Sequence, residues 1–151
     1  MIVRLNIFAV QRHSGGEQMF RISPINDKNL QAEYAALCGV ELISDYFAYS
    51  MTDVETGELM GFSQFEILGS YGYIATLVPR KNYSDFEAMF ILGRATMNFI
   101  DMCGAHLCRA AKDAADESLL RAIGFKESDD GELVADMTGM FDGHCGGSCE
   151  E

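Results

Sequence analysis

Short runs of apolar and β-favouring residues alternate with turn residues along the first half of the chain and predict a sheet. Residues 1–10 are largely apolar and form a candidate strand, whereas residues 11–18 are polar, contain Ser14-Gly15-Gly16 and predict a loop. Residues 20–23 predict a short strand that Pro24 ends, because proline lacks the N–H that a ladder needs. Three further runs predict an antiparallel meander over residues 46–53, 59–68 and 71–78, with turns at 55–58 and 69–70.

Helical patterns flank this meander. Asp27 is a predicted N-cap for a helix over residues 28–37, and Gly39 is its predicted end. The pattern is strongest over residues 85–103, where apolar residues cover much of the helix circumference and residues 84–87 match a capping box. A helix this apolar must be largely buried, and packing against the sheet is the simplest way to bury it.

The last third of the chain predicts a parallel connection followed by a hairpin. Residues 105–111 form a candidate strand, so that the strand at 71–78, the long helix and this strand make a βαβ unit with parallel strands. Asp113 is the predicted cap of a short helix over residues 114–123, which Gly124 ends. Residues 125–127 and 132–137 then predict a hairpin. The expected fold class is α/β (α+β), with a mixed, mostly antiparallel sheet, a central βαβ unit and flanking helices.

The length and composition favour one globular domain. The chain has 151 residues, of which 48% are hydrophobic, enough for a sizeable core. We expect an N-terminal extension at residues 1–18, a domain at residues 19–137 and a glycine- and cysteine-rich tail at residues 138–151. Residues 1–10 lack the features of a signal peptide, and no apolar run is long enough to span a membrane, so the expected location is the cytoplasm.

The charge narrows the range of partners. With 23 acidic and 11 basic residues the formal net charge is −12, which disfavours binding to nucleic acid or to anionic membranes. The same charge would attract a cationic amine, or it serves solubility alone. The five cysteines are an odd number without a secretory signal, so a disulfide framework is not expected. Cys38, Cys103 and Cys108 lie in apolar segments and are predicted to be buried thiols.

Two segments carry a family resemblance. Residues 113–127, DAADESLLRAIGFKE, contain a capped helix that runs into Gly124-Phe125, and residues 55–62, ETGELMGF, form a strand-connecting turn. With the order of elements, these segments resemble the GNAT N-acetyltransferase family from about Met19 to Met137. The resemblance implies transfer of an acetyl group from acetyl-CoA, as substrate, to a small-molecule or peptide amine. It leaves open whether the chain forms a homodimer.

The resemblance also implies where the donor binds. In this fold the strands at 71–78 and 105–111 would separate and admit the pantetheine arm, and the diphosphate would lie at the N-terminus of the long helix. The residues that match these positions are Leu77, Val78, Arg80, Lys81 and Asp113, the last standing where the family has an asparagine. Arg80 and Lys81 would be phosphate ligands, or simply a solvated basic pair.

Two positions depart from the family pattern. The loop at residues 79–89 contains no glycine, and Ser84 and Glu87 of the capping box would compete with a phosphate for backbone N–H groups. Leu120 stands where the family often has a tyrosine general acid. The remaining candidates are Glu66 as the catalytic base and Tyr73 as the acid, with the alternatives that Glu66 faces solvent and Tyr73 packs.

The tail offers a separate hypothesis. His144, Cys145 and Cys149 are soft-metal ligands in a glycine-rich stretch, and a zinc site would need a fourth ligand such as His106, Cys103, Cys108 or a residue of a second chain. Alternatively, the two tail cysteines are free thiols or a redox pair. Three functions therefore remain: an N-acetyltransferase, a non-catalytic protein of the same fold that binds a ligand or partner, and a metal- or thiol-dependent role of the tail.

Overall fold

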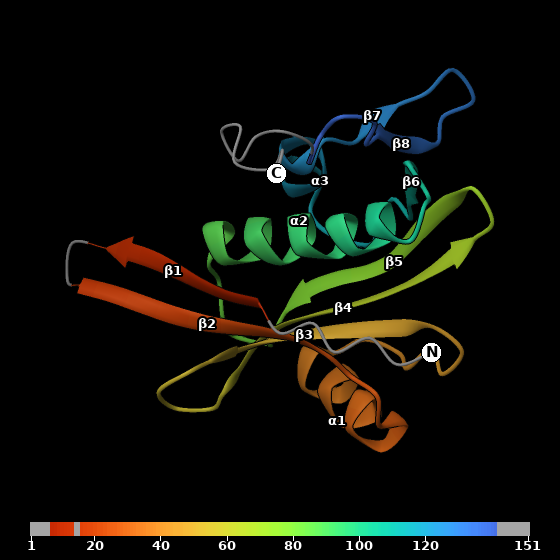
Figure 1. Cartoon of the computed structure of the whole chain (residues 1–151). Helices are drawn as coiled ribbons and strands as arrows, with labels where there is room; N and C mark the ends of the chain where they lie inside the picture. The colour runs from red at the N-terminus through yellow and green to blue at the C-terminus, as the bar shows by residue number, and fades with distance from the viewer. Residues whose placement is uncertain (1–6, 14–15, 142–151) are drawn as a thin grey trace.

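The computed structural model describes residues 7–13 and 16–141, with side chains from Met19 onward, and the described residues form one eight-stranded sheet and three helices (Figure 1). The strands are β1 (Ile7–His13), β2 (Gly16–Pro24), β3 (Phe47–Asp53), β4 (Leu59–Leu68), β5 (Tyr71–Pro79), β6 (Leu107–Ala110), β7 (Lys126–Glu127) and β8 (Leu133–Asp136). The helices are α1 (Lys28–Cys38), α2 (Phe86–Met102) and α3 (Glu117–Ile123).

The sheet follows chain order except at its last edge, where the order is β6-β8-β7. Strands β1 to β5 pair antiparallel, and β5 pairs parallel with β6. Helix α2 connects these two parallel strands, so the predicted βαβ unit and the mixed fold class are confirmed. Figure 1 shows α2 on one face of the sheet and α1 on the other, with α3 beside α2.

Two apolar clusters hold these layers together. The larger lies between α2, α3 and the sheet and includes Leu92, Met97 and Ile100, all fully buried. The smaller lies under α1 around Phe62. Ile100 packs so closely on β5 that a Cβ added at Gly72 would lie 2.5 Å from one of its methyl groups. The predicted burial of the long helix against the sheet is therefore confirmed.

The strand β5 carries an irregularity that decides the shape of the site. Its register against β4 shifts so that Gln64 faces Thr76 while Phe65 faces Ile74, which leaves Ala75 as an extra residue. Such a bulge bends its strand and increases the local twist. The parallel pairing of β5 with β6 ends at Ile74 and Ala110, and the last five residues of β5 run on beyond it.

Several local predictions were wrong. The polar segment 11–18 is not a loop, because β1 continues to His13 and β2 begins at Gly16, and the two strands form a hairpin. The short helix begins at Glu117 after Asp116 and not at residue 114 after Asp113. The cap of α2 is Asp85 rather than Ser84, with the Asp85 carboxylate accepting the Ala88 N–H. By contrast, Asp27 and Gly39 cap α1 as predicted.

Candidate active site

The separation of β5 from β6 is flanked by a cavity on each side of the sheet. The first, here called the α2-side cavity, has a volume of about 410 Å³ and lies between the end of β5, the N-terminus of α2 and α3. The second, the α1-side cavity, has about 380 Å³ and lies between β5 and the loop after α1. Val78 and Asp113 line both cavities, so the two cavities border the same part of β5 and of the chain after β6.

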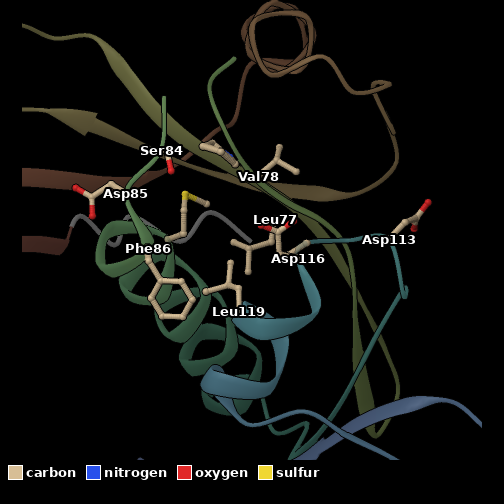
Figure 2. A pocket seen from close by; sticks show the side chains of 11 residues that line it. Leu77, Val78, Ser84, Asp85, Phe86, Asp113, Asp116 and Leu119 are labelled. Carbon is tan, nitrogen blue, oxygen red and sulfur yellow. The ribbon is translucent and has the colours of Figure 1, made fainter. Parts of the chain in front are cut away.

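The α2-side cavity combines an apolar floor with carboxylates. Figure 2 shows Leu77, Val78 and Leu119 between Asp85 on one side and Asp113 on the other, with Phe86 at the start of α2. Asp116 also lines the cavity. None of the lining side chains is a lysine or an arginine. The cavity therefore suits an apolar group and opposes a strongly anionic one.

The N-terminus of α2 is already capped by its own side chain. The Asp85 carboxylate accepts the Ala88 N–H at 3.1 Å and also the Tyr83 hydroxyl at 3.3 Å. Burial, with the Asp85 charge as the next cause, raises the pKa of Tyr83 to about 12, so this hydroxyl remains a donor at neutral pH. Because a phosphate at a helix N-terminus needs free N–H groups and a positive field, Asp85 occupies the place of the anion.

Part of the backbone in the gap is also paired. The Ala111 N–H donates to the Ile74 carbonyl at 3.0 Å, and the Leu77 N–H donates to the Ala114 carbonyl at 2.8 Å. The chain after β6 thus runs beside β5 and is joined to it by isolated hydrogen bonds on either side of the bulge, not by a continuous ladder. The parallel register of β5 with β6 therefore ends at Ile74, before the last five residues of β5.

The structure separates the predicted donor-binding residues. Leu77, Val78 and Asp113 line the α2-side cavity, and their role in binding a donor stays a prediction. The Arg80 side chain contacts the start of β4 and the loop before it. Its Nε donates to the Leu59 carbonyl at 2.7 Å, and its guanidinium lies 3.7 Å from Glu58. The stem of Lys81 lies over Gly39. Neither basic residue lines either of the two cavities.

A buried glutamine that the sequence pattern did not single out shapes the α1-side cavity. Gln64 is fully buried. Its Oε1 accepts Gln31 Nε2 and the Ile43 N–H, both at 2.9 Å, and its Nε2 donates to the Glu41 carbonyl at 2.9 Å and to Thr76 at 3.1 Å. These four bonds attach the loop after α1, which forms one wall of the cavity, to β4 and β5. The available signal was that Gln64 lies in a strand whose first seven residues are all buried.

The predicted acid and base are neighbours on the α1 side of the sheet. Glu66 and Tyr73 face each other across β4 and β5, two pairs from Gln64. The Tyr46 hydroxyl donates to Glu66 at 2.9 Å. Burial raises the pKa of Tyr73, and the charges of Asp113, Glu132 and Glu66 raise it further, so Tyr73 holds its proton at neutral pH. Neither Glu66 nor Tyr73 lines one of the two cavities.

The remaining sequence predictions have mixed outcomes. Leu120 is fully buried in the core and cannot serve in a site. Cys38 and Cys108 are buried as predicted, but Cys103 is exposed at the end of α2. His144, Cys145 and Cys149 lie outside the described residues. Within residues 7–13 and 16–141, no cluster of three or more His, Cys, Asp or Glu side chains could hold a metal ion. No helix of the described part has both the length and the apolar character of a membrane span.

Comparison with known proteins identifies the fold. The ribosomal-protein-S18-alanine N-acetyltransferase from Escherichia coli superimposes with a TM-score of 0.57 at 16% identity, covering 78% of this chain and 90% of that one. A bacterial toxin superimposes with a TM-score of 0.55 at 12% identity, covering 91% and 94%. The PaiA N-acetyltransferase from Thermoplasma acidophilum, solved with coenzyme A, gives 0.46 at 16% identity. That superposition covers 58% of this chain and 57% of the PaiA chain.

At these identities the likeness establishes the architecture. The chain has the GNAT fold of the N-acetyltransferases, as the sequence resemblance implied. No protein-family model matches the sequence, and no curated protein matches it either. The activity of this chain therefore has to be argued from its own site.

Proposed function

We propose that this protein is an N-acyltransferase that passes an acyl group, most simply acetyl, from a thioester to a cationic amine through the gap between β5 and β6. One observation carries the proposal: the cavities on opposite faces of the sheet share Val78 and Asp113. A donor on the α2 side and an amine on the α1 side can then meet at one point without crossing the sheet. Holding both reactants at a common point lowers the entropic cost of their encounter.

The α2-side cavity fits one end of acetyl-CoA and not the other. Leu77, Met89 and Leu119 provide an apolar wall for an acyl group and the pantetheine arm. The diphosphate end would be repelled by the Asp85 carboxylate, which already accepts the Ala88 N–H. None of the described residues that line this cavity is basic and could offset that repulsion. We therefore assign the thioester end as the recognised part of the donor, with little binding from the nucleotide.

The α1-side cavity supplies the acceptor's environment. Glu41 and Asp113 line it, and both are acidic, which favours an amine that carries further positive charge. The neutral amine nitrogen attacks the thioester carbon, the C–S bond breaks, and the nitrogen loses a proton while the thiolate gains one. Tyr73 holds its proton at neutral pH, which suits an acid and not a base, but it lines neither cavity and would have to approach the thiolate from the neighbouring part of β5.

The donor assignment has a direct test. Acetylation of a polyamine and of a basic peptide is followed by mass spectrometry with acetyl-CoA and with acetyl-pantetheine, which lacks the nucleotide. We expect kcat/KM values for the two donors within about tenfold, because less than about 1.4 kcal/mol of binding comes from the phosphates. Added salt should lower KM for acetyl-CoA by screening the carboxylates and leave KM for acetyl-pantetheine unchanged. A much higher kcat/KM for acetyl-CoA, falling with salt, would contradict this assignment.

Two matched substitutions separate the faces of the gap. Asp113→Asn removes a carboxylate that lines both cavities, whereas Asp116→Asn removes one that lines the α2 side alone. We expect Asp113→Asn to raise KM for the cationic amine about two- to fivefold, because Asp113 is exposed and an exposed charge contributes up to about 1 kcal/mol. Asp116→Asn should leave that KM unchanged. Equal effects of the two changes on the amine would show that acceptors do not enter from the α1 side.

A second candidate is a protein of this fold that binds a ligand without transferring a group. The capped N-terminus of α2 and the buried Leu120 favour it. It predicts no product with any donor, together with an unaltered melting temperature in acetyl-CoA and acetyl-pantetheine. A rise in melting temperature without product for either donor would instead indicate that a thioester binds and the acceptor class is wrong.

A further inference from the structure

A third cavity lies away from the gap, between the start of β3, the end of β4 and the C-terminal end of α2. It has a volume of about 290 Å³ and shares no lining residue with the other two cavities. Four aromatic side chains line it: Phe47 and Tyr49 from β3, Phe65 from β4 and Phe99 from α2. Asn26 and Cys103 add polar groups to its lining.

The four rings form one connected cluster. Tyr49, Phe65 and Phe99 pack with ring centroids 5.7 to 5.8 Å apart, and Phe47 lies 5.7 Å from Phe65 and 6.1 Å from Phe99. Three of the rings are buried, while Phe47 is 52% exposed. An aromatic ring left half in water beside a cavity is an incomplete packing arrangement, because a further apolar group would remove it from solvent.

The hydroxyl of Tyr49 is the second, independent feature. The side chain is 2% exposed, and its hydroxyl has no hydrogen-bond partner among the described residues. Buried polar groups are nearly always paired, so an unpaired one in the lining of a cavity points to a missing partner. Burial raises the pKa of this hydroxyl to about 12, so it stays protonated and can donate. The missing partner is therefore an acceptor.

We propose that this cavity binds a small aromatic molecule that carries one hydrogen-bond acceptor oxygen. The ring would pack among Phe47, Phe65 and Phe99, and the oxygen would accept the Tyr49 hydroxyl. The volume lies at the lower end of the range for ligand pockets, about 300 Å³, which suits a molecule of roughly ten non-hydrogen atoms. The site is distinct from the gap and does not depend on the proposed transfer reaction.

Two probe molecules of equal size isolate the hydrogen bond. Acetophenone carries a carbonyl, and isopropylbenzene has the same number of non-hydrogen atoms without the oxygen. Binding to the full chain is measured from the shifts of the backbone amide signals of Ala48 and Tyr49 during titration. We expect acetophenone to bind about two- to tenfold more tightly than isopropylbenzene, which is the usual net effect of one hydrogen bond between neutral groups.

Substitutions assign the effect to residues. Tyr49→Phe should abolish the difference between the two probes by weakening acetophenone alone. Tyr71→Phe is the matched control, since that hydroxyl lies on β5 outside the cavity lining. Phe47→Ala, at an exposed ring whose loss the fold should tolerate, should weaken both probes. Bound probe should also slow alkylation of Cys103, which lines the cavity and is exposed.

Three results would overturn the proposal. The first is the absence of shifts for both probes up to millimolar concentration. The second is a Tyr49→Phe variant that weakens both probes equally, because the hydroxyl would then not contact the oxygen. The third is a clear fall in melting temperature of probe-free Tyr49→Phe, because removal of a hydroxyl without a partner should leave stability unchanged or raise it.

Discussion

Replacing Gln64 by methionine tests whether one buried amide holds the wall of the α1-side cavity. Methionine has a side chain of about the same length and removes all four side-chain hydrogen bonds of Gln64. The Ile43 N–H then loses its partner, Gln31 Nε2 keeps the Ile43 carbonyl alone, and the Glu41 carbonyl and the Thr76 hydroxyl lose a donor. Glu41 is exposed, so water can replace the donor to its carbonyl, whereas the Ile43 N–H and the Thr76 hydroxyl stay at least partly buried. Each of these two costs about 2 kcal/mol without a partner, and the more apolar side chain offsets about 1 kcal/mol. We expect a net loss of about 3 kcal/mol in the free energy of unfolding.

Urea unfolding measures this loss, which should lower the midpoint by roughly 1–2 M for a typical slope. The matched control is Ser63→Ala, one residue earlier on β4. Ser63 is equally buried, its hydroxyl pairs with the Thr96 hydroxyl, and Thr96 keeps its bond to the Leu92 carbonyl. This change should cost about 1 kcal/mol.

Amide hydrogen exchange locates the effect of the Gln64 substitution. The Ile43 amide should lose protection in Gln64→Met and keep it in Ser63→Ala, because the side-chain oxygen Oε1 of Gln64 is the acceptor for that N–H. The reasoning fails if both variants lose the same stability, or if Ile43 remains protected when Gln64 is replaced. Either result would mean that the loop is held by its other contacts.

Three further changes test the fold and the site. Gly72→Ala should lower the free energy of unfolding by about 1–3 kcal/mol, because the new methyl group would lie 2.5 Å from an Ile100 methyl, and calorimetry measures it. Asp85→Ala should cost about 1 kcal/mol through the lost cap and, in a binding titration, tighten acetyl-CoA several-fold by removing a negative charge. If the nucleotide lies elsewhere, the tighter binding of acetyl-CoA is absent and the loss of stability remains. If Tyr73 is the acid, its raised pKa preserves activity at neutral pH and places the loss of activity above pH 10. A lower-pH loss that Tyr73→Phe removes would contradict this.

The elements of this fold were predictable because their signals are local. The meander, the long apolar helix and the final hairpin follow from periodicity and turn residues, and Asp27 with Gly39 marks α1 at both ends. The errors arose where neighbouring residues compete for one role. Ser84 and Asp85 can each cap α2, and Asp113 and Asp116 can each precede α3, so packing of the flanking chain decides between them.

Leu77, Val78 and Asp113 could be placed at the site from the sequence, because they follow from the strand positions that the fold resemblance supplies. Arg80 could not, since its guanidinium is drawn to the Leu59 carbonyl and to Glu58 by contacts between distant parts of the chain. Gln64 was overlooked because its four partners come from three other elements or loops. Hydrogen bonds of this kind leave no periodic trace in a sequence.

The order of strands and helices, the burial of α2 and the glycine-free loop before it could be read from the chain, because they depend on side chains close together in the sequence. The tertiary structure alone decided that β5 bulges at Ala75 and parts from β6. It also decided that Val78 and Asp113 each line two cavities, and that Tyr49 is buried with its hydroxyl unpaired among the described residues. The physical reason is that a register shift and a cavity are set by packing between elements, which local sequence preferences do not specify.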